Sequence, residues 1–172
     1  MGDQAYIDAL CNGDKAKGTD LHSLTKKIGD IESRDLAKNV IYCLLFGGGD
    51  DKLGKTAKKP GQGKQLREKL YKGFDGLEEL VERLTKEWRS TAKKRYNARF
   101  NRMEYFDGFI TGLDGRPIAV PYEHQLLVYL LQSDEAIMMT AAYNKLHKEL
   151  SKKYTWGVDY GIVCWYHDEY TI

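Results

Sequence analysis

Four residues within residues 34–49 have the types and the spacing of a nucleotide-binding helix. They are two cations followed by two aromatic rings at four-residue steps, Arg34, Lys38, Tyr42 and Phe46. In an α-helix, residues four apart differ by only ~40° around the axis, so this row would follow one slanting line on one side. An arginine binds phosphate oxygens with a fork of N–H groups and a lysine acts as a point charge, while a ring can stack on a sugar or a base. The row therefore indicates nucleotide binding, although amphipathic helices with ordinary surface cations are common.

A second group of residues that could take part in a reaction is the triplet His167, Asp168 and Glu169 near the end of the sequence. Residues 160–166 are rich in β-branched and aromatic residues and predict a strand, so the triplet lies where that strand should turn. Adjacent carboxylates on a turn can hold hard divalent cations, and two such cations commonly assist phosphoryl transfer. An exposed acidic turn is the alternative interpretation. The return strand would have three residues, so we expect the hairpin to be cut short.

Two further polar residues stand out by their position. Arg116 follows Asp114 and Gly115, a pair that predicts a tight hairpin turn within residues 109–120. Gln132 follows two leucines in a segment, residues 122–153, that is expected to be helical over most of its length.

These residues need a helical framework, and the sequence predicts one. Asp20 or Thr19 can cap a helix that ends at Gly29, and Ser33 can cap the helix that carries the Arg34 row. Residues 52–63 are rich in Lys and Gly and predict a loop. Further helices are predicted over residues 5–11, 64–71 and 77–88.

Composition limits the class of protein. The chain of 172 residues is 42% hydrophobic and 30% charged, which suits one globular domain of ordinary size. Seven Lys or Arg against one acid in residues 86–102 favour a polyanion partner, with a solvated helix face as the alternative. The basic segment should continue the helix before it or follow that helix. Three scattered cysteines, no recognisable leader peptide and no apolar run near ~20 residues predict a soluble intracellular protein without a membrane partner.

Taken in order, these patterns resemble the family A DNA polymerases, in particular the replicative branch of podophages. Arg34, Lys38, Tyr42 and Phe46 with Gly47 resemble motif B, the nucleotide-binding helix of the fingers, written R-x3-K-x3-(F/Y)-x3-Y-G. Residues 166–169 resemble motif C, the palm hairpin with its H-D-E triplet. Residues 20–23 look like the D-x-H-[ST] stretch before motif B, and residues 111–116 and 130–133 look like linking segments of the palm and fingers.

The resemblance implies a role for each matching residue. For the nucleotide, it implies triphosphate binding by His22, Arg34 and Lys38 and packing on the deoxyribose by Tyr42. For the DNA, it implies contact with the template by Phe46 and Gly47, contact with DNA by Arg116, and contacts with the primer and the minor groove by Gln132 and His167. It implies metal binding by Asp168 and Glu169. Lys38 and Asp168 would be the catalytic residues. The cofactor implied is Mg²⁺ at a two-metal site whose second carboxylate this sequence lacks.

The sequence also departs from the family pattern. Phe46 stands where the family usually has Tyr, Val128 where it often has Asn, and Asp134 and Glu135 where small residues are usual. No segment matches motif A, the strand with the family's other catalytic aspartate. We therefore expect a single, incomplete α+β polymerase fragment over residues 1–172. In it, residues of about 14–105 would be mostly helical fingers, and residues 106–172 a palm segment with a small antiparallel sheet.

The expected function is that of a DNA-directed DNA polymerase fragment that adds dNTPs to a primer 3′-hydroxyl on a template. We expect primer–template DNA and dNTPs as partners, a cytoplasmic location in a bacterium or phage-infected cell, and no activity without a second polypeptide that supplies motif A and the thumb. The alternatives are a non-catalytic nucleotide- or DNA-binding remnant, a subunit of a split phage polymerase, and an unrelated helical nucleic-acid-binding protein.

Overall fold

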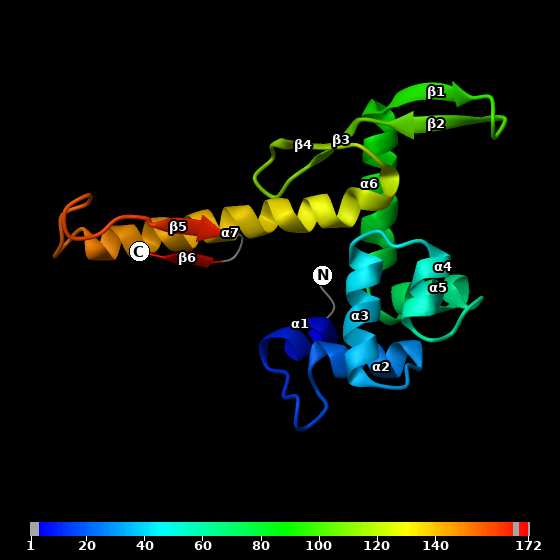
Figure 1. Ribbon diagram of the computed structural model, residues 1–172, viewed down its shortest axis with the longest axis horizontal. Helices are drawn as coiled ribbons and strands as arrows, with labels where there is room; N and C mark the ends of the chain where they lie inside the picture. The colour runs from blue at the N-terminus through cyan, green and yellow to red at the C-terminus, as the bar shows by residue number, and fades with distance from the viewer. Residues whose placement is uncertain (1–3, 167–168, 172) are drawn as a thin grey trace. The chain divides into compact units, whose positions relative to one another are not determined.

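The computed structural model describes residues 4–166 and 169–171, which form an α+β structure of mostly helices and three two-stranded sheets (Figure 1). The predicted fold class is thereby confirmed. The helices are α1 (Gln4–Cys11), α2 (Leu21–Gly29), α3 (Arg34–Leu45), α4 (Asp50–Thr56), α5 (Gly63–Gly73), α6 (Leu77–Thr91) and α7 (Leu126–Leu150), with the short 3₁₀ helix η1 (Glu123–Gln125). The strands are β1 (Lys93–Asn97), β2 (Arg102–Phe106), β3 (Gly108–Thr111), β4 (Pro117–Val120), β5 (Cys164–Tyr166) and β6 (Glu169–Thr171).

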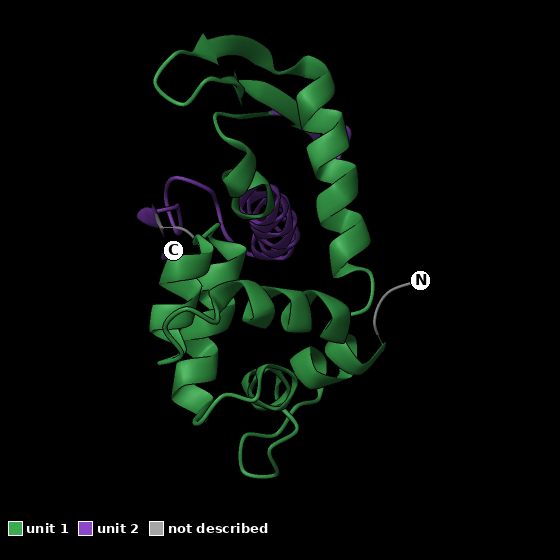
Figure 2. Cartoon of the chain, turned by 90° about the vertical axis from the view of Figure 1, so that its right-hand side faces the viewer, with its two compact units in different colours: residues 1–110, 119–128 green, residues 111–118, 129–172 purple. Residues whose placement is uncertain are grey.

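The chain divides into two compact units, which Figure 2 shows in different colours. The first consists of residues 1–110 and 119–128, and the second of residues 111–118 and 129–172. The predicted fingers and palm ranges stay a prediction.

Helix α3, which carries the Arg34 row, and helix α2 before it both begin at predicted caps. The Asp20 side chain accepts a hydrogen bond from the backbone N–H of His22, and Ser33 Oγ accepts one from Leu36 N–H at 3.2 Å. Both caps satisfy backbone donors that a helix leaves free in its first turn. Local sequence therefore fixes where α2 and α3 start.

The core of the first unit forms where α3, α4 and α5 pack together. Ala37, Val40, Ile41 and Leu44 are buried on α3, as the predicted stripe requires, whereas Leu45 is only partly buried. The same cluster contains Ile31, Leu53, Ala57, Leu66, Leu70 and Phe74. Burial of this stripe turns the opposite side of α3 to the surface.

The loop predicted over residues 52–63 is wrong in its first half, which is part of α4. Gly49 precedes the helix, and Asp50 and Asp51 lie in its first turn, where carboxylates interact favourably with the helix dipole. Leu53 in the helix and Ala57 just after it are four residues apart and both buried in the core. Their burial outweighs the weak helix propensity of the Lys- and Gly-rich sequence.

The basic segment, residues 86–102, begins in the last turns of α6 and continues as strand β1 and the turn that leads to β2. Helix α6 ends at Thr91, and β1 then pairs antiparallel with β2 in the register Lys93 to Phe106 and Asn97 to Arg102. Buried Trp88 anchors the end of α6 by donating from Nε1 to the carbonyl oxygen of Val120 at 2.7 Å. Strands β3 and β4 form the hairpin predicted around Asp114 and Gly115.

The second unit contains most of α7 and the pair β5–β6. The strand predicted over residues 160–166 is shorter than expected, because only Cys164–Tyr166 pairs with β6. Before it, Trp156 and Tyr160 pack on His147 of α7, and the Tyr160 hydroxyl lies 2.9 Å from His147 Nδ1. None of the described helices combines the length and the apolarity needed to cross a membrane.

Candidate functional site

The row of cations and rings lies on the surface side of α3. Lys38 is exposed, and the rings of Tyr42 and Phe46 are 45% and 59% exposed, with their centroids 6.4 Å apart. Large exposed rings on a helix with a buried opposite face leave apolar surface in contact with water. The geometry predicted for the row is therefore present, with its cations near the start of α3 and its rings near the end.

Helix α2 adds His22 to this surface. Its ring lies 6.0 Å from the Tyr42 ring in an edge-on arrangement. His22 Nδ1 is buried and has no hydrogen-bond partner among residues 4–166 and 169–171. Burial, together with the positive charges of Arg34 and Lys38, holds the pKa of His22 below its ordinary value, and Asp20 opposes this shift. A buried polar atom without a partner is costly, so Nδ1 indicates a place where a ligand could donate or accept a hydrogen bond.

Arg34 is not free, because Asp20 binds it. Arg34 Nη2 and Nε lie 2.7 and 3.1 Å from Asp20 Oδ2. The same carboxylate accepts hydrogen bonds from Ser23 Oγ at 2.5 Å and from the backbone of His22. These contacts, the Arg34 hydrogen bond first, hold the pKa of Asp20 well below its usual range. Asp20 thus fixes the guanidinium, which keeps further N–H groups for a ligand.

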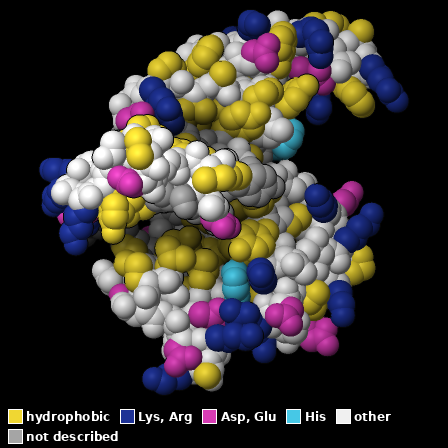
Figure 3. All heavy atoms as spheres, turned by 60° about the vertical axis from the view of Figure 1, so that its left-hand side comes forward, with side chains coloured by type: hydrophobic (Ala, Val, Ile, Leu, Met, Phe, Trp, Pro, Cys, Tyr) yellow, Lys and Arg dark blue, Asp and Glu magenta, His cyan; other side chains and the backbone are white. Residues whose placement is uncertain are grey.

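Charged and apolar groups meet on this surface. In the lower part of Figure 3, over α2 and α3, Lys and Arg side chains gather beside a histidine and a hydrophobic patch. A ligand with both an anionic end and a flat apolar end would match both kinds of side chain.

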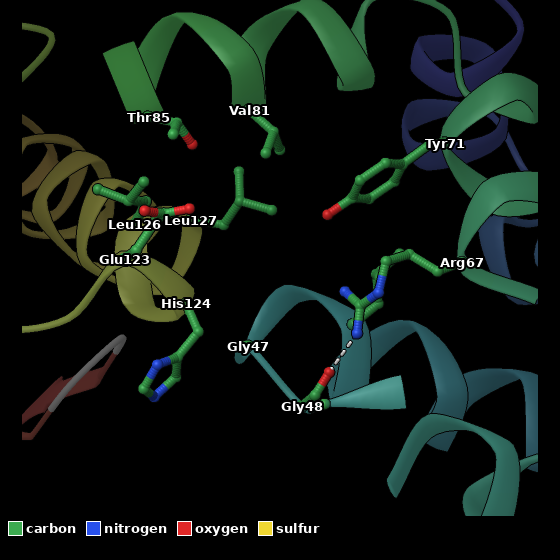
Figure 4. A pocket seen from close by; sticks show the side chains of 12 residues that line it. Gly47, Gly48, Arg67, Tyr71, Val81, Thr85, Glu123, His124, Leu126 and Leu127 are labelled. Atoms are coloured by element: carbon green, nitrogen blue, oxygen red, sulfur yellow. Dashed lines mark hydrogen bonds between the residues drawn. The ribbon is translucent and has the colours of Figure 1, made fainter. Parts of the chain in front are cut away.

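A pocket of about 380 Å³ lies at the end of α3, around the glycine run (Figure 4). Gly47 has a positive φ of 73°, and a Cβ atom there would lie 1.8 Å from the carbonyl oxygen of His124. Arg67 holds the turn by donating from Nη2 to the carbonyl oxygen of Gly48 at 2.6 Å and from Nε to Asp50 at 2.6 Å. The residue predicted to meet the template thus has a structural reason to be glycine. Arg67 was missed by sequence reasoning, since no local pattern links it to a turn 19 residues away.

In the second unit, the two predicted DNA-contact segments lie together. Arg116 Nη2 donates to Ser133 Oγ at 3.1 Å, and Arg116 Nε lies 3.3 Å from Asp114. Gln132, next to Ser133, is exposed and lines a cavity of about 410 Å³ together with Glu135 and Trp165. The structure therefore brings Arg116 close to the segment of Gln132.

The predicted metal-binding turn is described only in part. His167 and Asp168 lie outside the described residues, and Glu169 is exposed at the start of β6, opposite Tyr166. In the part of the chain that the structure describes, no three His, Cys, Asp or Glu side chains gather as metal ligands. The described donors alone do not make up a Mg²⁺ site.

Comparison with known proteins gives one consistent result. The chain is 28% identical over 168 residues to the DNA-directed DNA polymerases of Enterobacteria phage T3 and Escherichia phage T7, in both cases over 95% of this chain and 23% of the relative. It is 27% identical over 155 residues to the DNA-directed DNA polymerase of Escherichia phage Phieco32. No protein-family model matches. The chain thus spans about a quarter of the length of these relatives, and the resemblance to phage DNA polymerases predicted from its motifs is confirmed.

Proposed function

We propose that this chain, which is related in sequence to phage DNA-directed DNA polymerases, supplies the dNTP-binding part of a family A enzyme. The observation that carries the proposal is the surface of α2 and α3, where the unpartnered Nδ1 of His22 lies beside the charges of Arg34 and Lys38 and the ring of Tyr42. Because the chain spans 23% of its relatives, we assign template-directed polymerisation to the complete enzyme.

Each side chain of the surface has a distinct task in this proposal. Arg34 and Lys38 bind the triphosphate, and the ammonium of Lys38 stabilises negative charge that develops on the leaving pyrophosphate. His22, neutral in the free chain, takes up a proton when the triphosphate binds and donates a hydrogen bond to a phosphate oxygen. Tyr42 packs against the deoxyribose, and Phe46 meets the templating base at the turn that Gly47 forms.

The DNA contacts come from the other matched segments. Arg116 and Gln132 bind the primer–template, and His167 contacts the primer terminus. Asp168 and Glu169 would hold Mg²⁺, which when bound would supply positive charge next to the phosphates. Neighbouring carboxylates on one turn tend to diverge, so we propose that a part of the enzyme outside these 172 residues supplies the remaining carboxylate together with the thumb. The enzyme acts in the cytoplasm.

Primer extension tests the catalytic half of the proposal. The purified 172-residue chain, given Mg²⁺, primer–template and dNTPs, should not extend the primer. Addition of a polypeptide with motif A and the thumb should restore extension, and Asp168→Asn should abolish the restored activity. Extension by the 172-residue chain alone would contradict the need for a carboxylate from outside these residues, and restored activity in Asp168→Asn would remove the metal role from Asp168.

A further inference from the structure

The ribbon formed by β1 and β2 combines cations with aromatic rings. Across the ribbon Lys94 pairs with Tyr105, and Lys94 Nζ lies 5.5 Å from the ring centroid. Diagonally, the Arg95 guanidinium lies 5.4 Å from the Phe106 ring. These distances are within the range of cation–π contacts. Positive charge is therefore held directly beside ring faces along the ribbon.

The end of the ribbon presents rings to solvent. Phe100, in the turn between the strands, is 57% exposed and has the guanidinium groups of Arg99 and Arg102 at 5.5 and 5.3 Å. Tyr96 is equally exposed and pairs across the ribbon with Met103, which is half exposed. Exposed apolar groups collected at one place, rather than scattered, mark an interaction surface.

The charge of the ribbon suits a polyanion. Residues 93–107 contain five Lys or Arg and two carboxylates, a net charge of +3. Glu104 is shared between Arg95 at 3.6 Å and Arg102 at 3.8 Å. In the described parts of the chain, Lys94 and Arg99 have no carboxylate within ion-pair distance. Their charges are available to an anionic partner.

A groove beside β2 offers the same chemistry. It measures about 490 Å³, and its lining includes Arg95 and Arg102 together with the rings of Tyr105 and Phe106. The lining also includes Arg89, Glu104 and Glu123, so its cations exceed its carboxylates by one. A groove with an excess of cations and aromatic walls can follow a phosphate backbone while bases stack on the rings.

We propose that the β1–β2 ribbon binds an unpaired strand of DNA, with bases stacked on Phe100 and Tyr96 and phosphates on Lys94 and Arg99. A double helix would satisfy the cations, but its bases are already stacked on each other and would leave these rings uncovered. An acidic peptide would likewise neutralise the charge and leave the rings exposed. The inference takes from the proposed function only that the polymer is DNA, and it does not depend on the dNTP site of α2 and α3.

The test is fluorescence anisotropy of the full chain with a labelled oligothymidine of about 16 nucleotides, the upper range of one single-strand site. Phe100→Ala should weaken binding roughly 5- to 150-fold, the usual effect of losing one stacking ring, without changing the salt dependence. Phe100→Leu keeps an apolar side chain but no ring, so it should lose as much affinity as Phe100→Ala. Phe100→Trp should bind at least as tightly as wild type. Thermal unfolding of each variant serves as the control for the fold of the chain.

Charge is tested separately on the same oligonucleotide. Replacement of Lys94 and Arg99 by Gln should reduce the slope of log affinity against log salt by about 1.4, at ~0.7 for each single-strand phosphate contact. Wild-type affinity of Phe100→Ala and Phe100→Leu for the oligonucleotide would overturn the proposal. Equal affinity of wild type for a duplex or for polyglutamate would overturn it too. Titration with dNTP separates this outcome from a failure of the nucleotide site, since Phe100→Ala should bind dNTP as wild type does.

Discussion

Asp20 and Arg34 form an ion pair that ties the start of α2 to the start of α3, with Arg34 Nη2 2.7 Å from Asp20 Oδ2. The Asp20 side chain is 13% exposed and also caps α2. One carboxylate therefore sets the position of His22, in the first turn of α2, and the direction of the Arg34 guanidinium. A triphosphate that binds Arg34 must share it with Asp20.

This sharing predicts the effect of removing the Asp20 charge. Asp20→Asn keeps a good N-cap residue but deletes a negative charge next to the proposed triphosphate, so dNTP affinity should rise about two- to tenfold. The control is Asp30→Asn, which breaks the exposed Asp30–Lys59 pair and keeps a residue that tolerates the left-handed backbone there. Isothermal titration of both variants measures the change. A weaker complex for Asp20→Asn would mean that orientation of Arg34 matters more than charge.

The low pKa of His22 predicts a pH dependence of binding. Free His22 is neutral at pH 7, and a bound triphosphate would favour its protonated form, so binding takes up a proton. Affinity should therefore increase as pH falls from 8 through 6.5. His22→Gln cannot take up this proton, and the ratio of its affinity to that of wild type isolates the histidine from titration of the phosphates. A constant ratio from pH 8 to 6 would exclude His22 from the phosphate contact.

The lowered pKa of His22 also predicts how this residue changes the stability of the fold as pH changes. Because the folded chain binds the proton of His22 less readily than the unfolded chain does, this residue makes the free energy of unfolding fall as pH drops below 6.5. In His22→Gln, the free energy of unfolding should therefore fall less steeply below pH 6.5 than in wild type. Urea unfolding at several pH values measures it, and parallel curves for the two proteins would contradict the assignment.

The glycine turn after α3 predicts a packing effect that is distinct from backbone strain. Gly47→Ala places a Cβ against the His124 carbonyl oxygen at a positive φ, so it should destabilise the fold by roughly 2–4 kcal/mol. Gly61 also has a positive φ, but open space surrounds it, so Gly61→Ala should cost only the backbone term of about 1–2 kcal/mol. Urea unfolding of the two variants compares them. Equal losses of unfolding free energy in the two variants would show that the backbone near His124 moves to make room for the added Cβ.

Local sequence predicted the parts of this structure that depend on neighbours along the chain. The caps at Asp20 and Ser33 and the buried stripe of α3 follow from residue type and helical spacing. Helix α4 was missed because its stability comes from burying Leu53 and Ala57 in a tertiary core. The contacts of Arg34 with Asp20 and of Arg67 with Gly48 join residues 14 and 19 apart, and no propensity encodes them.

The measurement that tests the central claim most directly is a dNTP titration of the folded chain and its Lys38→Ala variant. If Lys38 binds the triphosphate, the variant should bind dNTP roughly 1.5–3 kcal/mol more weakly, the value of a charge-assisted contact. Lys64→Ala, an exposed lysine on α5, should bind as wild type does. The corresponding deoxynucleoside, which lacks the phosphates, should show no difference between wild type and Lys38→Ala. Equal dNTP affinity in wild type and Lys38→Ala would contradict the account.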